Sequence, residues 1–202
     1  MSVKSVQVCT MRALLNCYNY KEVWVLKTYD KRLIAADMLE EAILKFKVAE
    51  SELDYIQCIL LAGASIGITS PLLFEVDKKT SHEKSAESVI KIREYSLGRS
   101  LSELEKKQMF SGALRFNKQA YNSLKHAGNG NKLAASDDLE IEADFCEEAE
   151  ELLWAAIEDF KSLTISAEYW IDNGKNEFRL LIGQSDPLGT IPEMYCRPRS
   201  TE

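Results

Sequence analysis

The strongest structural signal in the chain is a stripe of apolar residues that recurs every three or four positions between residues 145 and 160. The stripe consists of Phe145, Ala149, Leu152, Leu153, Ala156, Ile157 and Phe160. At about 100° per residue, this spacing places the apolar side chains on one face of a helix. Such a face has to be covered, so the rest of the sequence must supply elements that pack against it.

The same helical spacing of apolar residues recurs over residues 30–64, 81–97 and 167–182. Helix-breaking residues are few, with 4 prolines and 9 glycines in the whole chain. We therefore predict an all-α protein that forms a single helical bundle of about five to seven helices. The 30–64 region is open to two interpretations, which are one long helix or two antiparallel helices separated by a kink near residues 49–51.

Capping residues and helix breakers give the expected helix ends. Asp30 is expected to cap the first helix of the bundle, and the SLSE sequence at 100–103 matches a capping box that starts a later one. Asp137 or Asp138 is expected to cap the helix that carries the apolar stripe. The residues expected to end the 30–64 helical region, through low helix propensity or a missing amide hydrogen, are Gly63, Gly67 and Pro71.

The chain, at 202 residues, is long enough for one domain with its own hydrophobic core. We expect residues 1–29 to be an N-terminal extension, in which valines spaced two apart indicate short strands while residues 11–15 look helical. Residues 30–182 are expected to form the bundle. Residues 183–202 contain glycine, proline and charged residues without periodicity, so we predict a flexible C-terminal tail there.

The cysteines and the apolar runs bear on the compartment. The 5 cysteines lie far apart, without a C-x-x-C pair or a histidine at metal-ligand spacing, which disfavours a disulfide framework or a metal site. Free thiols fit a reducing cytoplasm, and the N-terminal sequence lacks the features of a secretory signal. The longest apolar run, residues 56–68, is shorter than the about 20 residues that cross a bilayer. We therefore expect a cytoplasmic protein with no membrane association, metal or cofactor.

Charge is distributed unevenly along the chain, whose formal net charge is -7. Residues 99–132 contain seven basic and two acidic side chains, a net charge of +5. Residues 137–159 contain eleven acidic and no basic side chains, a net charge of -11. The overall negative charge argues against a protein that coats nucleic acid over its whole surface. The two segments are either neighbouring helices with complementary charges, or the basic one forms a groove for an anionic ligand.

The candidate chemical centre is the polar stretch 115–131, which ends in a glycine-rich break. Its basic and amide side chains recur at the spacing that places them on one face of a continuous helix. They are Arg115, Lys118, Asn122, Lys125 and His126. Such a face can hold a phosphate or a partner's carboxylate, and it can equally be an ordinary solvated face. The other histidine, His82, begins the 81–97 helix without a carboxylate or cysteine partner, so we interpret it as a surface residue.

The segment 121–128, YNSLKHAG, resembles the R-N-x-x-x-H-G motif of HEPN domains, which are small helical bundles. Asn122, His126 and Gly128 stand near the motif positions, and the EAEELLWAA sequence at 148–156 resembles the closing helix of that family. The segment is also similar to the N-box of histidine-kinase ATPase domains, but the glycine boxes that this second family requires are missing. The HEPN resemblance covers most of the predicted bundle.

The HEPN resemblance implies a protein that interacts with RNA or a nucleotide in a stress or defence setting. In nucleolytic members the arginine and histidine of the motif act together on RNA, one stabilising phosphate charge and the other transferring a proton. A nuclease of this kind is a metal-independent endoribonuclease, with His126 as acid or base, Asn122 as the orienting residue and Arg115 or Lys118 at the phosphate. The expected substrate contacts are Lys118, Lys125, Tyr121 and Lys132.

One departure from the family pattern divides the functional prediction in two. Tyr121 stands where the family has its arginine, and none of the nearby basic residues lies at the family's spacing. The alternative to a ribonuclease is a catalytically silent homodimeric adaptor or regulator that binds protein partners and uses its acidic helix for basic ones. The sequence leaves open whether the protein is an enzyme.

Overall fold

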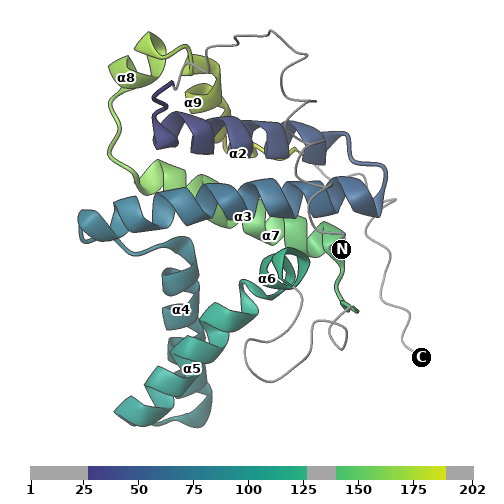
Figure 1. Cartoon of the computed structure of the whole chain (residues 1–202). Coiled ribbons are helices and arrows are strands. Elements are labelled where there is room, and N and C mark those ends of the chain that lie inside the picture. Colours follow the sequence, from purple (N-terminus) through teal and green to yellow (C-terminus); the bar gives the residue numbers. More distant parts are fainter. Residues whose placement is uncertain (1–26, 127–139, 190–202) are drawn as a thin grey trace, which may run out of the picture.

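The computed structural model describes residues 27–126 and 140–189. Within these ranges the chain forms eight helices and no strand (Figure 1). The helices are α2 (Lys31–Lys47), α3 (Glu52–Glu75), α4 (Ser81–Leu97), α5 (Glu103–Phe116), α6 (Gln119–Lys125), α7 (Phe145–Ser162), α8 (Ala167–Asp172) and α9 (Asn176–Ile182). The predicted all-α bundle is confirmed, whereas the strands expected near the N-terminus lie outside the described ranges.

The hydrophobic core lies along α3, which packs against both α2 and α7 (Figure 1). Fully buried side chains of these three helices include Leu39, Ile43, Ile59, Leu153 and Ile157. The short helices α8 and α9 add aromatic residues to this core. The ring of Phe178 lies 5.3 Å from that of Phe160 and 5.7 Å from that of Trp170, both in edge-to-face geometry. The predicted apolar stripe of α7 therefore faces the core.

The first two helices answer the question that the sequence left open for residues 30–64. Asp30 caps α2 as expected, because its carboxylate accepts a hydrogen bond from the backbone N–H of Arg32 at 2.8 Å. After α2 ends at Lys47, Ser51 caps α3 in a capping box with Asp54. The two-helix interpretation is therefore confirmed, and α2 and α3 run side by side (Figure 1).

The predicted end of this region at Gly63, Gly67 and Pro71 is wrong, because α3 continues through all three residues. Each glycine costs about 1 kcal/mol relative to alanine, and proline removes one amide donor. Packing of α3 against α2 and α7 outweighs these local costs. Among the described helices α3 is the one long and apolar enough to cross a membrane, although it occupies the position of a core helix.

Helices α4 and α5 form a hairpin, called the α4–α5 arm below, that extends away from the body of the molecule (Figure 1). Gly98 ends α4 with a φ of 61°, a left-handed conformation that glycine adopts without steric cost. The capping box that starts α5 joins Ser102 to Glu105, two residues beyond the predicted one at 100–103. The buried residues of α4 are His82 and Ala86, and α5 has none, so the arm adds little to the core.

The predicted continuous helix of the polar stretch is interrupted. Helix α5 ends at Phe116, and α6 begins at Gln119 after a turn at Asn117 and Lys118. The turn changes the direction of the chain, so that α6 lies against α3 with Ala120 buried (Figure 1). The polar residues of the stretch are therefore divided between two helices.

Helix α7 carries the predicted stripe but begins later than expected. Its cap is Asp144, whose carboxylate accepts hydrogen bonds at 3.1 Å from the backbone N–H groups of Cys146 and Glu147. The predicted caps Asp137 and Asp138 lie outside the described residues. The acidic residues between 140 and 144 thus precede the helix instead of forming its first turn.

The first part of the predicted C-terminal tail is packed against the body. Pro187 is fully buried, and Leu188 is 4% exposed and belongs to the core. The packed body therefore extends past residue 182 to at least Leu188. Residues 190–202 lie outside the described ranges.

Candidate functional site

The three residues predicted to be catalytic are divided between two helices. Arg115 lies in the last turn of α5, whereas Asn122 lies on α6 and His126 at its end, and all three are exposed. The backbone N–H of His126 donates a hydrogen bond to the carbonyl of Asn122 at 3.0 Å. No hydrogen bond joins the side chain of any of the three to another described residue. Among the described residues, these three side chains therefore lack the supporting contacts that orient an acid–base pair.

Tyr121 packs against the core helix α3. Its ring lies over Gly63 of α3, so close that a Cβ atom at Gly63 would be less than 3.0 Å from three ring atoms. The ammonium of Lys125 lies 5.4 Å from the centre of the same ring. Gly63 thus allows α6 to dock on α3, and Tyr121 fills the space that this docking creates.

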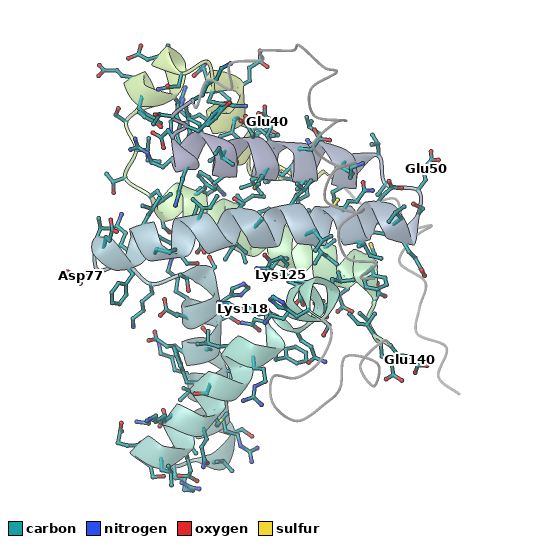
Figure 2. The ribbon with its side chains drawn as sticks, viewed as in Figure 1. Glu40, Glu50, Asp77, Lys118, Lys125 and Glu140 are labelled. Carbon is teal, nitrogen blue, oxygen red and sulfur yellow. The ribbon has the colours of Figure 1, made fainter. Side chains whose placement is uncertain are left out.

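The basic residues of the 99–132 segment are spread over the arm and α6. Within the arm, Arg99 pairs with Glu105 at 2.8 Å and Lys106 pairs with Glu94 at 3.5 Å. Lys118 directly precedes α6 and Lys125 is its last residue, and both are labelled in Figure 2. The predicted substrate contact Lys132 falls outside the described residues. Among the described basic residues of this segment, Arg99 and Lys106 are therefore paired within the arm, whereas Lys107, Arg115, Lys118 and Lys125 have no ion pair with a described residue.

A cavity of about 850 Å³ is lined by residues of α3, α4, α5, α6 and α7. We call it the central cavity. Its apolar walls include Ile59, Val89, Met109, Phe116, Leu152 and Trp154. Of the residues predicted to be functional, Tyr121 lines the cavity, and no lysine or arginine is among its described lining residues. The cavity is therefore a different site from the polar stripe that the sequence indicated.

His82 lines the central cavity, so its interpretation as a surface residue is wrong. Its side chain is 6% exposed, and its Nε2 atom has no hydrogen-bond partner among the described residues. Burial lowers the pKa of His82 to about 4, with a smaller contribution from the positive charge of Lys118. At neutral pH the imidazole is therefore neutral, with one N–H donor and one nitrogen acceptor.

A buried carboxylate explains why His82 is buried. Asp159 of α7 is fully buried, and its Oδ1 atom accepts a hydrogen bond from the backbone N–H of Ser81 at 2.6 Å. This bond holds the first turn of α4 against α7 and carries the adjacent His82 into the interface. Burial raises the pKa of Asp159, whose Oδ2 atom has no partner among the described residues.

Three carboxylates of α7 line the central cavity on the side of the helix that turns away from the core. Glu148, Glu151 and Glu158 recur at helical spacing. Glu158 pairs with Lys161 at 2.8 Å, whereas Glu148 and Glu151 have no ion pair with a described residue. Burial raises the pKa of Glu148, and the neighbouring charge of Glu151 adds to the effect. The cavity thus combines apolar walls with a negatively charged edge.

The residues of this cavity were missed because their signals in the sequence are weak. The three glutamates belong to a dense acidic run, which by itself indicates a solvated face. His82 lies four residues before Ala86, which is also buried, so the two share a face of α4. This spacing was the available signal in the sequence for the burial of His82. The described residues contain no group of His, Cys, Asp and Glu side chains arranged to hold a metal ion.

Comparison of the chain with protein-family models, with curated proteins and with solved structures gave no match.

Proposed function

We propose that the protein is a catalytically silent adaptor or regulator that acts as a homodimer and associates through the α4–α5 arm. The observation that carries the proposal is the set of large apolar side chains that this arm exposes. They are Val89, Ile92, Tyr95, Leu97, Leu104 and Phe116. Tyr95 is 91% exposed and Ile92 is 68% exposed. Several large apolar side chains that gather on one projecting hairpin are typical of an interaction surface.

A second copy of the chain fits this surface because the arm carries both signs of charge. A hollow of about 460 Å³ on the arm is lined by Glu87, Lys91 and Glu94 of α4, and by acidic and basic residues of α5. In a two-fold symmetric dimer the same patch meets itself, so each basic side chain can face an acidic one of the other copy. A strongly acidic or strongly basic partner would meet side chains of its own charge sign on this arm as well as opposite ones.

The packing of Tyr121 supports a silent protein over a ribonuclease. An arginine that acts at a phosphate must reach solvent and the substrate, whereas the Tyr121 ring covers Gly63. Arg115, the proposed substitute for that arginine, lies on a different helix from Asn122 and His126. These positions favour the adaptor, which was the alternative prediction from the sequence.

RNA interaction is a second candidate function, which the exposure of α6 favours. Asn122, Lys125 and His126 are all exposed, and Lys118 lies at the start of the same helix. This edge can contact phosphates without any catalysis. Binding of this kind weakens steeply as the salt concentration rises, because phosphate contacts release counterions.

The two candidates differ in their behaviour towards RNA. We expect the purified protein to leave structured and single-stranded RNA uncleaved, both with and without EDTA. The His126→Ala variant is the matched control. Cleavage that survives EDTA and disappears in His126→Ala would contradict the adaptor proposal and assign a nuclease centre to α6. Binding without cleavage that weakens steeply with salt would support the second candidate.

A further inference from the structure

We propose that the central cavity binds a small organic cation, a primary amine with an apolar aromatic body and a hydrogen-bonding group at the far end. The proposal goes beyond the adaptor function, because dimerisation through the arm requires no small ligand. It depends on three features of the cavity, which are its size and walls, its charge, and an unpartnered buried side chain.

The size and walls of the cavity fit a small molecule. A volume of about 850 Å³ falls within the range of about 300–1,000 Å³ that is common for ligand sites. The walls include the aromatic residues Phe116, Tyr121 and Trp154. Aromatic rings pack against other rings in offset or edge-to-face geometry, and their faces attract organic cations.

The charge of the cavity selects a cation. Glu148 and Glu151 lie three residues apart on the cavity side of α7, without an ion pair among the described residues. Glu148 is half-buried, so its charge is screened less than that of a fully exposed group. Since the described lining contains no lysine or arginine, a ligand ammonium is the group that complements these two carboxylates.

His82 provides the second polar contact. It lines the cavity, more than nine-tenths of its side chain is buried, and its Nε2 atom has no partner among the described residues. Buried polar groups in native structures almost always have a hydrogen-bond partner. Because Nε2 is itself buried, the imidazole must turn to present it to the cavity. A hydroxyl group of the ligand then supplies the partner, because it can either donate to or accept from a neutral imidazole.

Isothermal titration calorimetry on the full-length chain at pH 7 tests the proposal with two probes of opposite charge. Tyramine and 3-(4-hydroxyphenyl)propionate share the phenol ring and the two-carbon spacer, but one ends in an ammonium and the other in a carboxylate. We expect tyramine to bind at least about tenfold more tightly. Absence of tyramine binding, or equal binding of the two probes, would overturn the proposal. Phenethylamine, which lacks the hydroxyl, should bind more weakly than tyramine, and equal binding would contradict the contact with His82.

Three variants locate the site. The Glu148→Gln, Glu151→Gln double variant should weaken tyramine binding about tenfold or more, whereas Glu150→Gln, on the same helix but not in the cavity lining, should leave it unchanged. Gly112 lines the cavity on α5, and a Cβ atom there meets nothing within 4 Å, so Gly112→Leu should narrow the cavity without a backbone clash. We expect this variant to lose binding while its circular dichroism stays helical. Wild-type affinity in both the double variant and Gly112→Leu would show that tyramine binds elsewhere.

Discussion

At the scale of single residues, the contact between Gly63 and Tyr121 fixes the position of α6 on the core helix α3. Gly63 lies in the middle of the core helix α3, where alanine has the higher intrinsic helix propensity. The close approach of the Tyr121 ring explains why a residue without a side chain stands there. The same contact holds the Tyr121 ring against α3.

Substitution of Gly63 should therefore destabilise the protein. The Cβ atom of Gly63→Ala would overlap the Tyr121 ring, and we expect a net loss of about 1–2 kcal/mol in the free energy of unfolding. Gly67→Ala is the matched control on the same helix, because a Cβ atom there meets nothing within 4 Å. It should be neutral or stabilise by up to about 1 kcal/mol. Urea unfolding measures both, and equal effects of the two substitutions would contradict the contact.

Buried His82 should make stability dependent on pH. Its pKa of about 4 in the folded protein lies below the value of about 6.5 in an unfolded chain. Between these two values the unfolded state binds more protons, so the stability contribution is complete above pH 6.5 and is lost as the pH falls towards 4. The expected loss is on the order of 3 kcal/mol.

The comparison with His82→Leu isolates this effect. Asp159 acts in the opposite direction, because burial raises its pKa and its contribution to stability grows as the pH falls. Both proteins contain Asp159, so the difference between their urea unfolding curves at pH 7 and pH 4.5 reports His82. We expect the wild type to lose more stability than the variant over this interval. Parallel losses would mean that His82 is not held in its neutral form.

At the scale of helices, periodicity determines which side chains are buried, whereas tertiary packing determines where several helices end. The apolar stripe of α7 predicted most of the buried residues of that helix, because burial follows from the 3.6-residue repeat, although Cys146 and Asp159 are buried as well. Helix ends were harder to predict. Gly63 and Pro71 are ordinary helix breakers in isolation, yet α3 passes through both because it is packed against two neighbouring helices. The interruption between α5 and α6 at Asn117 and Lys118 follows from the docking of α6 on α3. No strong helix breaker in the sequence marks it.

Gly112 differs from Gly63 because an added side chain there meets no neighbour. Gly112 lies within α5, and no atom lies within 4 Å of a Cβ atom placed on it. Gly112→Ala should therefore gain helix propensity without a clash and stabilise the protein by about 0.5–1 kcal/mol. Gly98→Ala is the contrasting control, because the left-handed φ of 61° at the end of α4 disfavours alanine. The midpoint of thermal unfolding should be higher for Gly112→Ala than for the wild type, and lower for Gly98→Ala. A lower midpoint for Gly112→Ala would contradict the finding that position 112 has room for a side chain.

At the scale of the whole molecule, the fold was more predictable than the site. The all-α bundle follows from repeated helical spacing, which each segment of the chain reveals by itself. The central cavity depends on how five helices meet, and Glu148 looks the same in the sequence whether it faces a cavity or open solvent. The exposure of the arm was also hidden, because the apolar residues Ile92 and Tyr95 fit a helix that packs as well as one that is exposed.

The self-association proposed for the arm depends on its exposed apolar residues. Ile92→Lys and Tyr95→Lys together should disrupt a dimer without unfolding the chain, because both side chains lie largely in solvent. Phe74→Lys is the matched control. Phe74 is 80% exposed but lies at the end of α3, outside the arm, so its substitution should leave the association unchanged.

The most direct test of the homodimeric adaptor is the molar mass of the purified protein in solution, measured by light scattering after size-exclusion chromatography. The wild type and Phe74→Lys should elute with twice the 22.9 kDa mass of one chain, and the double arm variant with the mass of one chain. A wild-type mass of 22.9 kDa at every protein concentration tested would contradict the proposal.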